Sequence, residues 1–477
     1  MQRPLRRLNV IRALCIFLVL MPLCLRADTL ADIYELALKN DAQLKAAEAS
    51  YKALRESKTQ GRSALLPSIV ASGEYTSTDI DTDSIRIQPL DNTNYINFPS
   101  SSNNDTDITG YSISLQQNIF NLPAWFSFKQ GKELSKQAKA QFSADQQALI
   151  VRVVEAYFAV LRAADNLQTA NAEVAALQRQ LEQTQQRFEV GLIAITDVHE
   201  ARAVYDSAVV IQLEAEGQLG VSYEALTVLT GQPHSNLWQL DEKFPVNKPT
   251  PVKRADWVDF ALQNNFLLQA AGYAAEASHH NAKSKKSEHL PKLTGSYSYL
   301  DNDEDGDVSV QDVGKFPVDT QTDGNTLSLN LELPLYTGGF TSSARRQAYQ
   351  EFIQARETFI NTQRNTVQGT RALHLRVVTD VGTVKARNLA ITSSQSALDA
   401  TKAGYEVGTR NIVDVLQSQR LLFRALFDYS NARYDYVINM LRLKEQAGIL
   451  SPEDIYALNK WLQQPKPPSA KKQPSNN

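Results

Sequence analysis

The sequence predicts a mixed α+β membrane protein, in which long coiled-coil helices are joined to strands of a transmembrane β-barrel that one chain cannot close. Three observations support this prediction: an internal duplication, strand-like alternation and a long heptad pattern. The duplication places Phe188–Gly191 on Tyr405–Gly408, since both read aromatic-Glu-Val-Gly and lie 217 residues apart. Gly231 and Gly448 are separated by the same 217 residues. A constant spacing of this kind indicates that one structural module is present twice.

The strand-like segments occur in two pairs, one in each half of the chain. Between Leu327 and Leu335 a leucine stands at every second position, so one face of a strand would be apolar and the other mostly polar. The strands are expected at about 67–90 and 106–122 in the first half, and at about 291–301 and 325–337 in the second. Such strands suit the wall of a membrane barrel, and taken alone they suit a β-sandwich with one wet face equally well.

The helices favour the barrel over the sandwich. From Val153 to Phe188, positions that lie alternately three and four residues apart are apolar, with the exception of Thr184. A heptad seam of this length requires a coiled-coil partner. No proline interrupts residues 124–189, so this helix could extend about 100 Å at 1.5 Å per residue. Gly191 and Gly408 follow the long helices of the two repeats, where a left-handed cap suits glycine.

The strand count predicts an oligomer. A chain with two strand pairs supplies about four strands, whereas the smallest membrane barrels have about eight. Unpaired strand edges are not tolerated in lipid, so several copies must share one barrel. Three copies would supply about twelve strands, but edge closure alone does not fix the number at three.

Residues 1–27 have the features of a secretory signal peptide, with a basic start, an apolar core from Ala13 to Leu25, and expected cleavage after Ala27. Cys24 could indicate a lipoprotein, although Leu23 is larger than the residue that normally precedes a lipidated cysteine. The rest of the chain is expected to comprise a first repeat at 28–231, a linker at 232–250, a second repeat at 251–450, and a C-terminal segment at 451–477 with a disordered tail from Gln464.

Composition excludes several functional classes. Both cysteines lie in the leader, so no disulfide is expected after its removal. Loss of the leader removes five arginines and no acids, which changes the formal charge from −3 to −8 and disfavours nucleic acid as a partner. The remaining chain has no apolar run of 18 residues, so only strands could cross a membrane. It also has no P-loop, HExxH or nucleophile elbow, so neither an enzyme nor a cofactor is predicted.

Three longer motifs resemble the TolC family of outer membrane efflux proteins, namely Arg187–Val198, Gly404–Leu416 and Asn431–Tyr436. The resemblance extends over essentially the whole chain after the leader. It implies a homotrimer with a twelve-stranded barrel in the lipid of a Gram-negative outer membrane, above a twelve-helix periplasmic tunnel. It also implies a periplasmic adaptor (membrane fusion) protein and an inner-membrane pump as partners, with docking at the turns around Gly191 and Gly408. The chain would then be a passive, gated exit duct for efflux or type I secretion.

The resemblance further implies a gate at the periplasmic end of the tunnel. Tyr405 would be linked to Gln180 and Asp197. Arg410 would be linked to Thr196 and Asp197. The constriction would be a ring of Asp414 side chains, and Gln417 stands one turn further, where related chains carry a second aspartate. The ring would therefore contain three carboxylates rather than six, which argues against tight binding of blocking cations.

Local structure offers other roles for the same charged residues. Asn411 and Asp414 have the spacing of a capping box, and Asp197 could serve as a first-turn acid that favours the helix dipole. Arg410 could be a solvated side chain. The residues alone also leave open a periplasmic coiled-coil adaptor or structural protein, whose strands would form a soluble β-domain.

Two further clusters suggest metal sites weakly. An EF-hand-like spacing places side-chain oxygens around Gly306, at Asp301, Asp303, Asp305, Asp307 and Asp312. Flanking helices are missing from this pattern, so a solvated acidic loop is the alternative, and the segment from Asp79 to Asp107 is expected to be a similar mobile loop. The histidines at 279, 280 and 289 lie among lysines, which favours a solvated helix end over a metal site.

Overall fold

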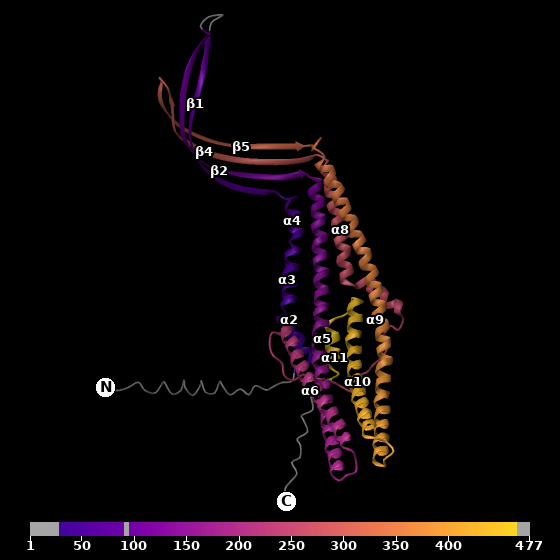
Figure 1. The fold of residues 1–477 in the computed structure, drawn as a ribbon. Coiled ribbons are helices and arrows are strands. Elements are labelled where there is room, and N and C mark those ends of the chain that lie inside the picture. The colour runs from indigo at the N-terminus through magenta and orange to yellow at the C-terminus, as the bar shows by residue number, and fades with distance from the viewer. Residues whose placement is uncertain (1–27, 90–94, 465–477) are drawn as a thin grey trace, which may run out of the picture. The chain divides into compact units, whose positions relative to one another are not determined.

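The computed structural model describes residues 28–89 and 95–464, which divide into two compact units (Figure 1). The first unit contains residues 28–48, 142–266 and 363–464, and the second contains 49–141 and 267–362. Each unit therefore takes a part of each sequence repeat. The predicted signal peptide at 1–27 and the predicted tail beyond Gln464 lie outside the described residues.

The helices follow the same order twice along the chain. The first series is α2 (Leu30–Asn40), α3 (Ala42–Arg55), α4 (Ser57–Ser63), α5 (Leu122–Glu189) and α6 (Ile195–Thr230). The second series is α7 (Arg254–Asn264), α8 (Phe266–Ser287), α9 (Phe340–Glu406), α10 (Ile412–Gln446) and, beyond the repeat, α11 (Pro452–Asn459). The lengths of α5 and α9, 68 and 67 residues, confirm the two long helices. In the part of the chain that the structure describes, no helix is both long enough and apolar enough to cross a bilayer.

Four long strands form one antiparallel sheet in the second unit. They are β1 (Ser68–Pro89), β2 (Tyr95–Phe120), β4 (Lys292–Val310) and β5 (Gly314–Glu332), in the spatial order β1-β2-β4-β5. The central pair joins the two repeats, because β2 and β4 run antiparallel from Ser102 opposite Val310 to Phe120 opposite Leu293. Among the described residues, β1 and β5 are the outer strands and each pairs on one side only.

A second, minor sheet lies in the first unit. Strand β3 (Gln239–Leu240) pairs with β6 (Leu462–Gln463), so the segment between the repeats contacts the C-terminal segment. Leu240 and Leu462 are both buried and belong to a core that includes Leu30 and Ile33 of α2 and Leu443 of α10.

Three strands extend beyond their predicted bounds. Strand β2 begins at Tyr95 instead of 106, β4 continues to Val310 instead of 301, and β5 begins at Gly314 instead of 325. The predicted mobile loop from Asp79 to Asp107 is therefore wrong, because most of it is paired strand. A segment rich in Asp, Asn, Ser and Thr is typical of a loop. Strands of a hairpin, however, pair through backbone N–H and C=O groups, and every residue except proline has both.

The same pairing argues against the weak EF-hand-like pattern and against the solvated loop that was its alternative. Asp301 to Asp307 lie in β4, where Asp305 is opposite Asp107 and Asp307 is opposite Asp105 on β2. Asp301, Asp303, Asp305 and Asp307 share one face of the strand, but each lies about 6.6 Å further along it than the one before, at 3.3 Å per residue, so their oxygens are not gathered around one point. Asp312 lies separately in the turn with φ 64°. No group of three or more His, Cys, Asp or Glu residues within 28–89 and 95–464 is placed to hold a metal ion.

A buried ion pair joins α2 to α5 in the first unit. The guanidinium of Arg152 donates to the carboxylate of Asp41, with Nη2 and Oδ2 2.5 Å apart and the Asp41 side chain only 5% exposed. Burial by itself raises the pKa of Asp41. The hydrogen bond and charge of Arg152, together with the N–H groups of Leu44 and Gln43, outweigh burial, so the pKa lies below its ordinary value.

Replacement of Asp41 by Asn is expected to lower the free energy of unfolding by about 2–4 kcal/mol near neutral pH, because Arg152 would keep its partly buried charge without a counterion. The folded-state pKa of Asp41 is lowered, so its contribution is complete above the pKa of the unfolded chain. It is lost as pH falls through the folded-state pKa. Thermal unfolding at neutral and acidic pH should show the variant and the original protein converging in acid. Asp206→Asn, at an exposed position, should change stability by less than about 0.5 kcal/mol.

Candidate functional site

The two predicted glycine turns follow the C-termini of α5 and α9. Gly191 has φ +77°, and the N–H of Leu192 donates to the carbonyl of Arg187 at 2.9 Å, which is the 6→1 bond of a Schellman cap. Gly408 has φ +79°, and Thr409 repeats this bond at 2.9 Å. A side chain at either glycine would be strained in the left-handed region. The predicted left-handed caps are confirmed.

Asp414 belongs to a capping box at the start of α10. The side chain of Asn411 accepts from the N–H of Asp414 at 2.8 Å, and the Asp414 carboxylate accepts from the N–H of Asn411 at 3.4 Å. The carboxylate also lies 3.8 Å from the guanidinium of Arg410 and is 38% exposed. The capping role is thus observed, and the carboxylate keeps an open side toward solvent. A pore role and a capping role are therefore compatible in one residue.

Tyr405 and Gln180 line the same cavity between the ends of α5, α9 and α10, with a volume of about 630 Å³. The cavity brings these two predicted partners to one place. The phenol oxygen of Tyr405 is buried there and has no hydrogen-bond partner, while the guanidinium of Arg187 lies 4.8 Å from the centre of the ring. The predicted hydrogen bonds of Tyr405 to Gln180 and Asp197 are absent from the described chain.

Gln419 is a residue of this cavity that the sequence analysis missed. Its side-chain Oε1 is buried without a partner, as is the phenol oxygen of Tyr405. A signal was present, because Gln419 stands in an apolar stripe of α10 that contains Ile412, Leu416 and Leu422. A buried polar atom without a partner costs about 1–3 kcal/mol, so both atoms have an unused capacity for a hydrogen bond within this cavity.

The remaining predicted gate residues are placed around the same helix ends. Arg410 pairs with Asp414 instead of Thr196 and Asp197. The hydroxyl of Thr196 is 3.5 Å from the carboxylate of Asp197, which lies in the first turn of α6. Gln417 is exposed and lines a different cavity of about 500 Å³. Within one described chain, the structure therefore shows none of the links between neighbouring helices that were predicted for Arg410.

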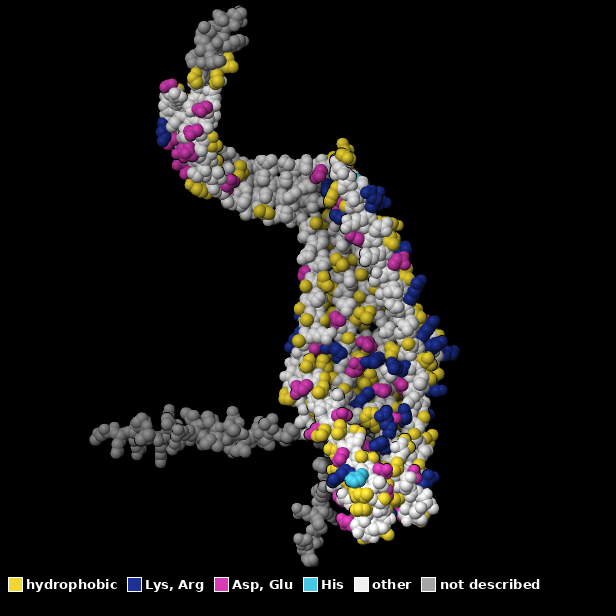
Figure 2. All heavy atoms as spheres, viewed as in Figure 1, with side chains coloured by type: hydrophobic (Ala, Val, Ile, Leu, Met, Phe, Trp, Pro, Cys, Tyr) yellow, Lys and Arg dark blue, Asp and Glu magenta, His cyan; other side chains and the backbone are white. Residues whose placement is uncertain are grey.

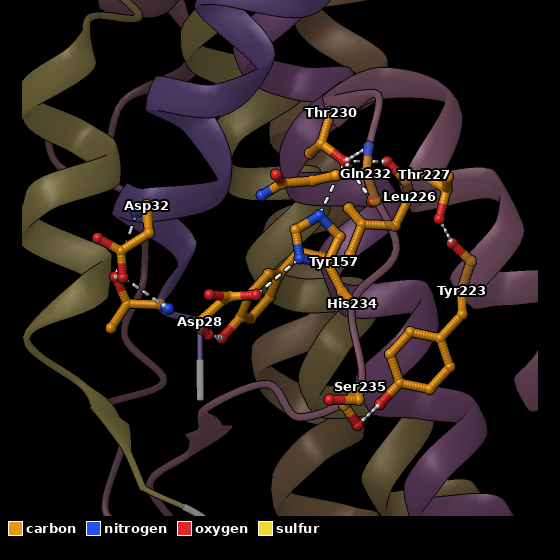
Figure 3. Close-up of polar contacts among 11 residues, drawn as sticks. Asp28, Asp32, Tyr157, Tyr223, Leu226, Thr227, Thr230, Gln232, His234 and Ser235 are labelled. Atoms are coloured by element: carbon orange, nitrogen blue, oxygen red, sulfur yellow. Dashed lines mark hydrogen bonds and ion pairs between the residues drawn. The ribbon is translucent and has the colours of Figure 1, made fainter. Parts of the chain in front are cut away.

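An Asp–His–Thr cluster elsewhere in the first unit, in which His234 and Thr230 are buried and Asp28 is partly exposed, has the composition of a catalytic triad (Figure 3). His234 Nδ1 lies 2.6 Å from a carboxylate oxygen of Asp28, and its Nε2 lies 2.8 Å from the hydroxyl of Thr230. Both ring nitrogens of His234 are therefore within hydrogen-bond distance of a side-chain oxygen. The side chain of His234 and all of Thr230 are fully buried, so a substrate cannot reach the hydroxyl. The cluster anchors the start of the described chain to the end of α6.

Comparisons with known sequences match both repeats of the chain. The model of the family described as outer membrane efflux protein matches residues 33–232 and again 257–448. The chain is similar to outer membrane protein TolC of Vibrio cholerae, with 38% identity over 441 residues that cover 91% of this chain and 94% of that protein. It is also similar to alkaline protease secretion protein AprF of Pseudomonas aeruginosa, with 27% identity, covering 91% of this chain and 88% of that protein.

Comparisons with solved structures give the fold independently. The outer membrane protein VceC from Vibrio cholerae matches with a TM-score of 0.71 and 18% identity, covering 88% of this chain and 96% of that chain. CusC matches with a TM-score of 0.72 and 15% identity, covering 89% and 93%. The predicted fold class, with long helices and strands in a duplicated chain, is confirmed by these structures and by the double family match.

Proposed function

Because the chain belongs to the outer membrane efflux protein family, we propose that it is the exit duct of a tripartite efflux or type I secretion system in the outer membrane. Efflux is the activity in the description of the family, and protease secretion is the activity in the name of AprF. The fold and family are those of outer membrane channels, which are not enzymes. Movement of the exported molecule would be driven by an inner-membrane pump, and this chain would supply a passage.

The observation that carries this proposal is the open four-stranded sheet. The outer strands β1 and β5 each pair on one side, so their other backbone groups need partners. In a bilayer each unpaired N–H or C=O costs several kcal/mol, and water is not present to replace the partner. Three copies satisfy these groups when β5 of one copy pairs with β1 of the next, which gives a closed barrel of about twelve strands. The exposed leucines of β5, including Leu327, Leu329 and Leu331, then face lipid.

Adaptor docking at the helix turns is supported by apolar exposure. Val190 and Leu192 flank Gly191, Val407 precedes Gly408, and all three apolar side chains are exposed. Exposed apolar residues beside two equivalent left-handed turns suit a protein partner that recognises both repeats. The partner proposed is a periplasmic adaptor, which would dock at the turns and release the nearby gate.

A cysteine-crosslinking experiment tests edge closure. Residues 28–477 contain no cysteine, so engineered cysteines are the only thiols in that part of the chain. One cysteine at Ala71 of β1 is combined in turn with cysteines at Leu327, Leu329 and Leu331 of β5. A covalent product of three chains, together with ion conductance in planar bilayers, is the expected result. Soluble single chains without conductance would instead favour the periplasmic adaptor or structural protein.

Asp414→Asn is expected to weaken the cation preference of the channel. Asparagine keeps a side-chain oxygen that can accept from the N–H of Asn411, so the helix cap survives while the charge is removed. Reversal potentials in a potassium chloride gradient measure the effect. Asp414→Ala removes the charge and also the acceptor for the N–H of Asn411, while the Asn411 side chain still caps the N–H of residue 414, so the added destabilisation should be about 0.5–1 kcal/mol. Unchanged selectivity in both variants would leave Asp414 with the capping role alone.

A further inference from the structure

Basic side chains surround the joints between strands and helices in the second unit. We define a basic collar by six residues: Arg62 of α4, Lys129 of α5, Lys283 and Lys286 of α8, and Arg345 and Arg346 of α9. All lie within about two helical turns of the helix end that is nearest to the strands, at 3.6 residues per turn. Figure 2 shows Lys and Arg side chains on the helices next to the strands, and Asp and Glu side chains along the far parts of the strands.

Contacts between the helices hold the collar together. A Cβ on Gly131 of α5 would lie 2.2 Å from the carbonyl of Ser57, so α4 and α5 are in close backbone contact. Ser284 of α8 donates to the carbonyl of Pro123 at the start of α5 at 3.0 Å. His279 of α8 stacks on Phe352 of α9 with ring centres 4.7 Å apart. The four helices therefore form one continuous surface in the order α4, α5, α8, α9.

The collar charges are not neutralised by the protein. Two lysines near the collar have carboxylate partners, since Lys136 contacts Glu133 at 2.8 Å and Lys285 contacts Glu288 at 2.7 Å. Throughout residues 28–89 and 95–464, the six collar side chains form no ion pair. Burial lowers the pKa of His280, and Lys283 and Lys129 lower it further. Burial is the main cause of this shift, and the two lysines add to it because they lie close to His280.

The charge is also unevenly distributed in sequence. The four joint segments, 55–67, 121–139, 276–292 and 332–346, contain thirteen Lys and Arg and five Asp and Glu. They therefore carry a net +8, whereas the whole chain carries −3. A positive ring in an otherwise acidic protein indicates a specific anionic partner.

The neighbours of the collar indicate what kind of anion binds. Trp125 and Phe126 lie beside Lys129, whose Nζ is 5.4 and 5.8 Å from their ring centres. On the other side Leu335 and Tyr336 are 89% and 88% exposed, at the end of the apolar strand face. A ring of aromatic and basic side chains next to exposed apolar strands has the polarity of a bilayer interface, where headgroup phosphates lie beside acyl chains.

We propose that the basic collar binds the headgroup phosphates of anionic phospholipids in the periplasmic leaflet. This inference rests on the proposed membrane insertion of the sheet, and it adds a lipid class to that function. Lys283, Lys286, Arg345 and Arg346 contact the phosphates, while Trp125 and Tyr336 lie at the level of the glycerol backbone. The acidic far parts of the strands repel the same headgroups, so the collar also fixes the depth and direction of insertion.

The test uses the full assembled protein in nanodiscs of phosphatidylcholine with a minority of phosphatidylglycerol. After extraction, mass spectrometry of the lipid retained on the protein is expected to show phosphatidylglycerol enriched about threefold or more over the bilayer. Combined replacement of Lys283, Lys286, Arg345 and Arg346 by Gln should return the ratio to that of the bilayer. A second variant exchanges Lys for Arg and Arg for Lys at these positions, and should keep the enrichment.

The matched control removes the same charge from exposed positions of the first unit, by changing Arg202, Lys248, Lys253 and Lys385 to Gln. It should leave enrichment unchanged, and an equal loss in the control would overturn the proposal. Conductance is measured on every preparation. A conducting protein without enrichment would overturn lipid binding and leave the exit duct standing, whereas a protein that never conducts would overturn both.

Discussion

Combined replacement of Tyr405 by Phe and Arg410 by Ser is expected to raise single-channel conductance several-fold in planar bilayers. The gate proposed at the ends of α5, α9 and α10 depends on polar contacts that are worth about 0.5–1.5 kcal/mol each. Contacts of this strength hold a closed state when several act together, and a docking partner can still release them. Loss of the contacts that Tyr405 and Arg410 would make in the proposed trimer should therefore shift the equilibrium toward the open state.

The state of Tyr405 in the single chain makes this experiment informative. Its phenol oxygen is buried without a partner in the cavity lined by Gln180 and Gln419. If the assembled gate leaves this oxygen unpaired, Tyr405→Phe should stabilise the protein, because a buried unsatisfied group is removed. If a neighbouring copy supplies a partner, the same change should open the channel. Conductance and thermal stability measured together distinguish these outcomes.

The control for the gate variant removes the same groups from exposed side chains. Tyr349→Phe with Arg202→Ser takes away one phenol oxygen and one guanidinium outside the cavity. This pair should leave conductance unchanged. If the Tyr405 and Arg410 variant also left conductance unchanged, both residues would be excluded from the gate, and the Arg410–Asp414 contact at 3.8 Å would be only a local helix interaction.

Features that depend on local spacing could be predicted from the sequence. The left-handed turns at Gly191 and Gly408 require only a glycine after a long helix. The capping box of Asn411 and Asp414 requires only residues three positions apart. The helices α5 and α9 follow from apolar periodicity without proline. In each case the residues that predict the feature are the same residues that form it, or lie within a few positions of them.

Features that depend on distant partners could not be predicted in this way. Strand β4 continues through Asp301–Asp307 because β2 pairs with it, and its composition alone indicated a loop. His234 meets Asp28, a residue 206 positions away, and neither lies in a recognisable motif. Gln419 in an apolar stripe gave a signal, but the cavity that makes it meaningful is formed by three helices. These features depend on contacts between residues that are far apart in the sequence, and one sequence does not show which distant residues meet.

Gly448→Ala is expected to destabilise the protein far more than Gly231→Ala, although the two glycines are equivalent in the repeat. Both are left-handed, with φ +72° and +74°, so alanine at either position costs about 1–2 kcal/mol of backbone strain. At Gly448 the added Cβ would also lie 2.3 Å from the backbone carbonyl oxygen of Asn264. At Gly231 the nearest atom would be the Cβ of Asn40 at 3.7 Å, an ordinary contact.

The difference between the two variants isolates the steric part of the cost, because the strain is common to both. A backbone carbonyl cannot rotate away as a side chain can, so Gly448→Ala should lose about 2 kcal/mol more than Gly231→Ala in denaturant unfolding. The comparison also tests how the repeats have diverged. Asn265, next to Asn264, donates to the carbonyl of Gln446 at 2.9 Å and holds this corner in place. Equal losses in the two variants would mean that the corner at Asn264 moves freely, and that the tighter turn of the second repeat contributes nothing to its stability.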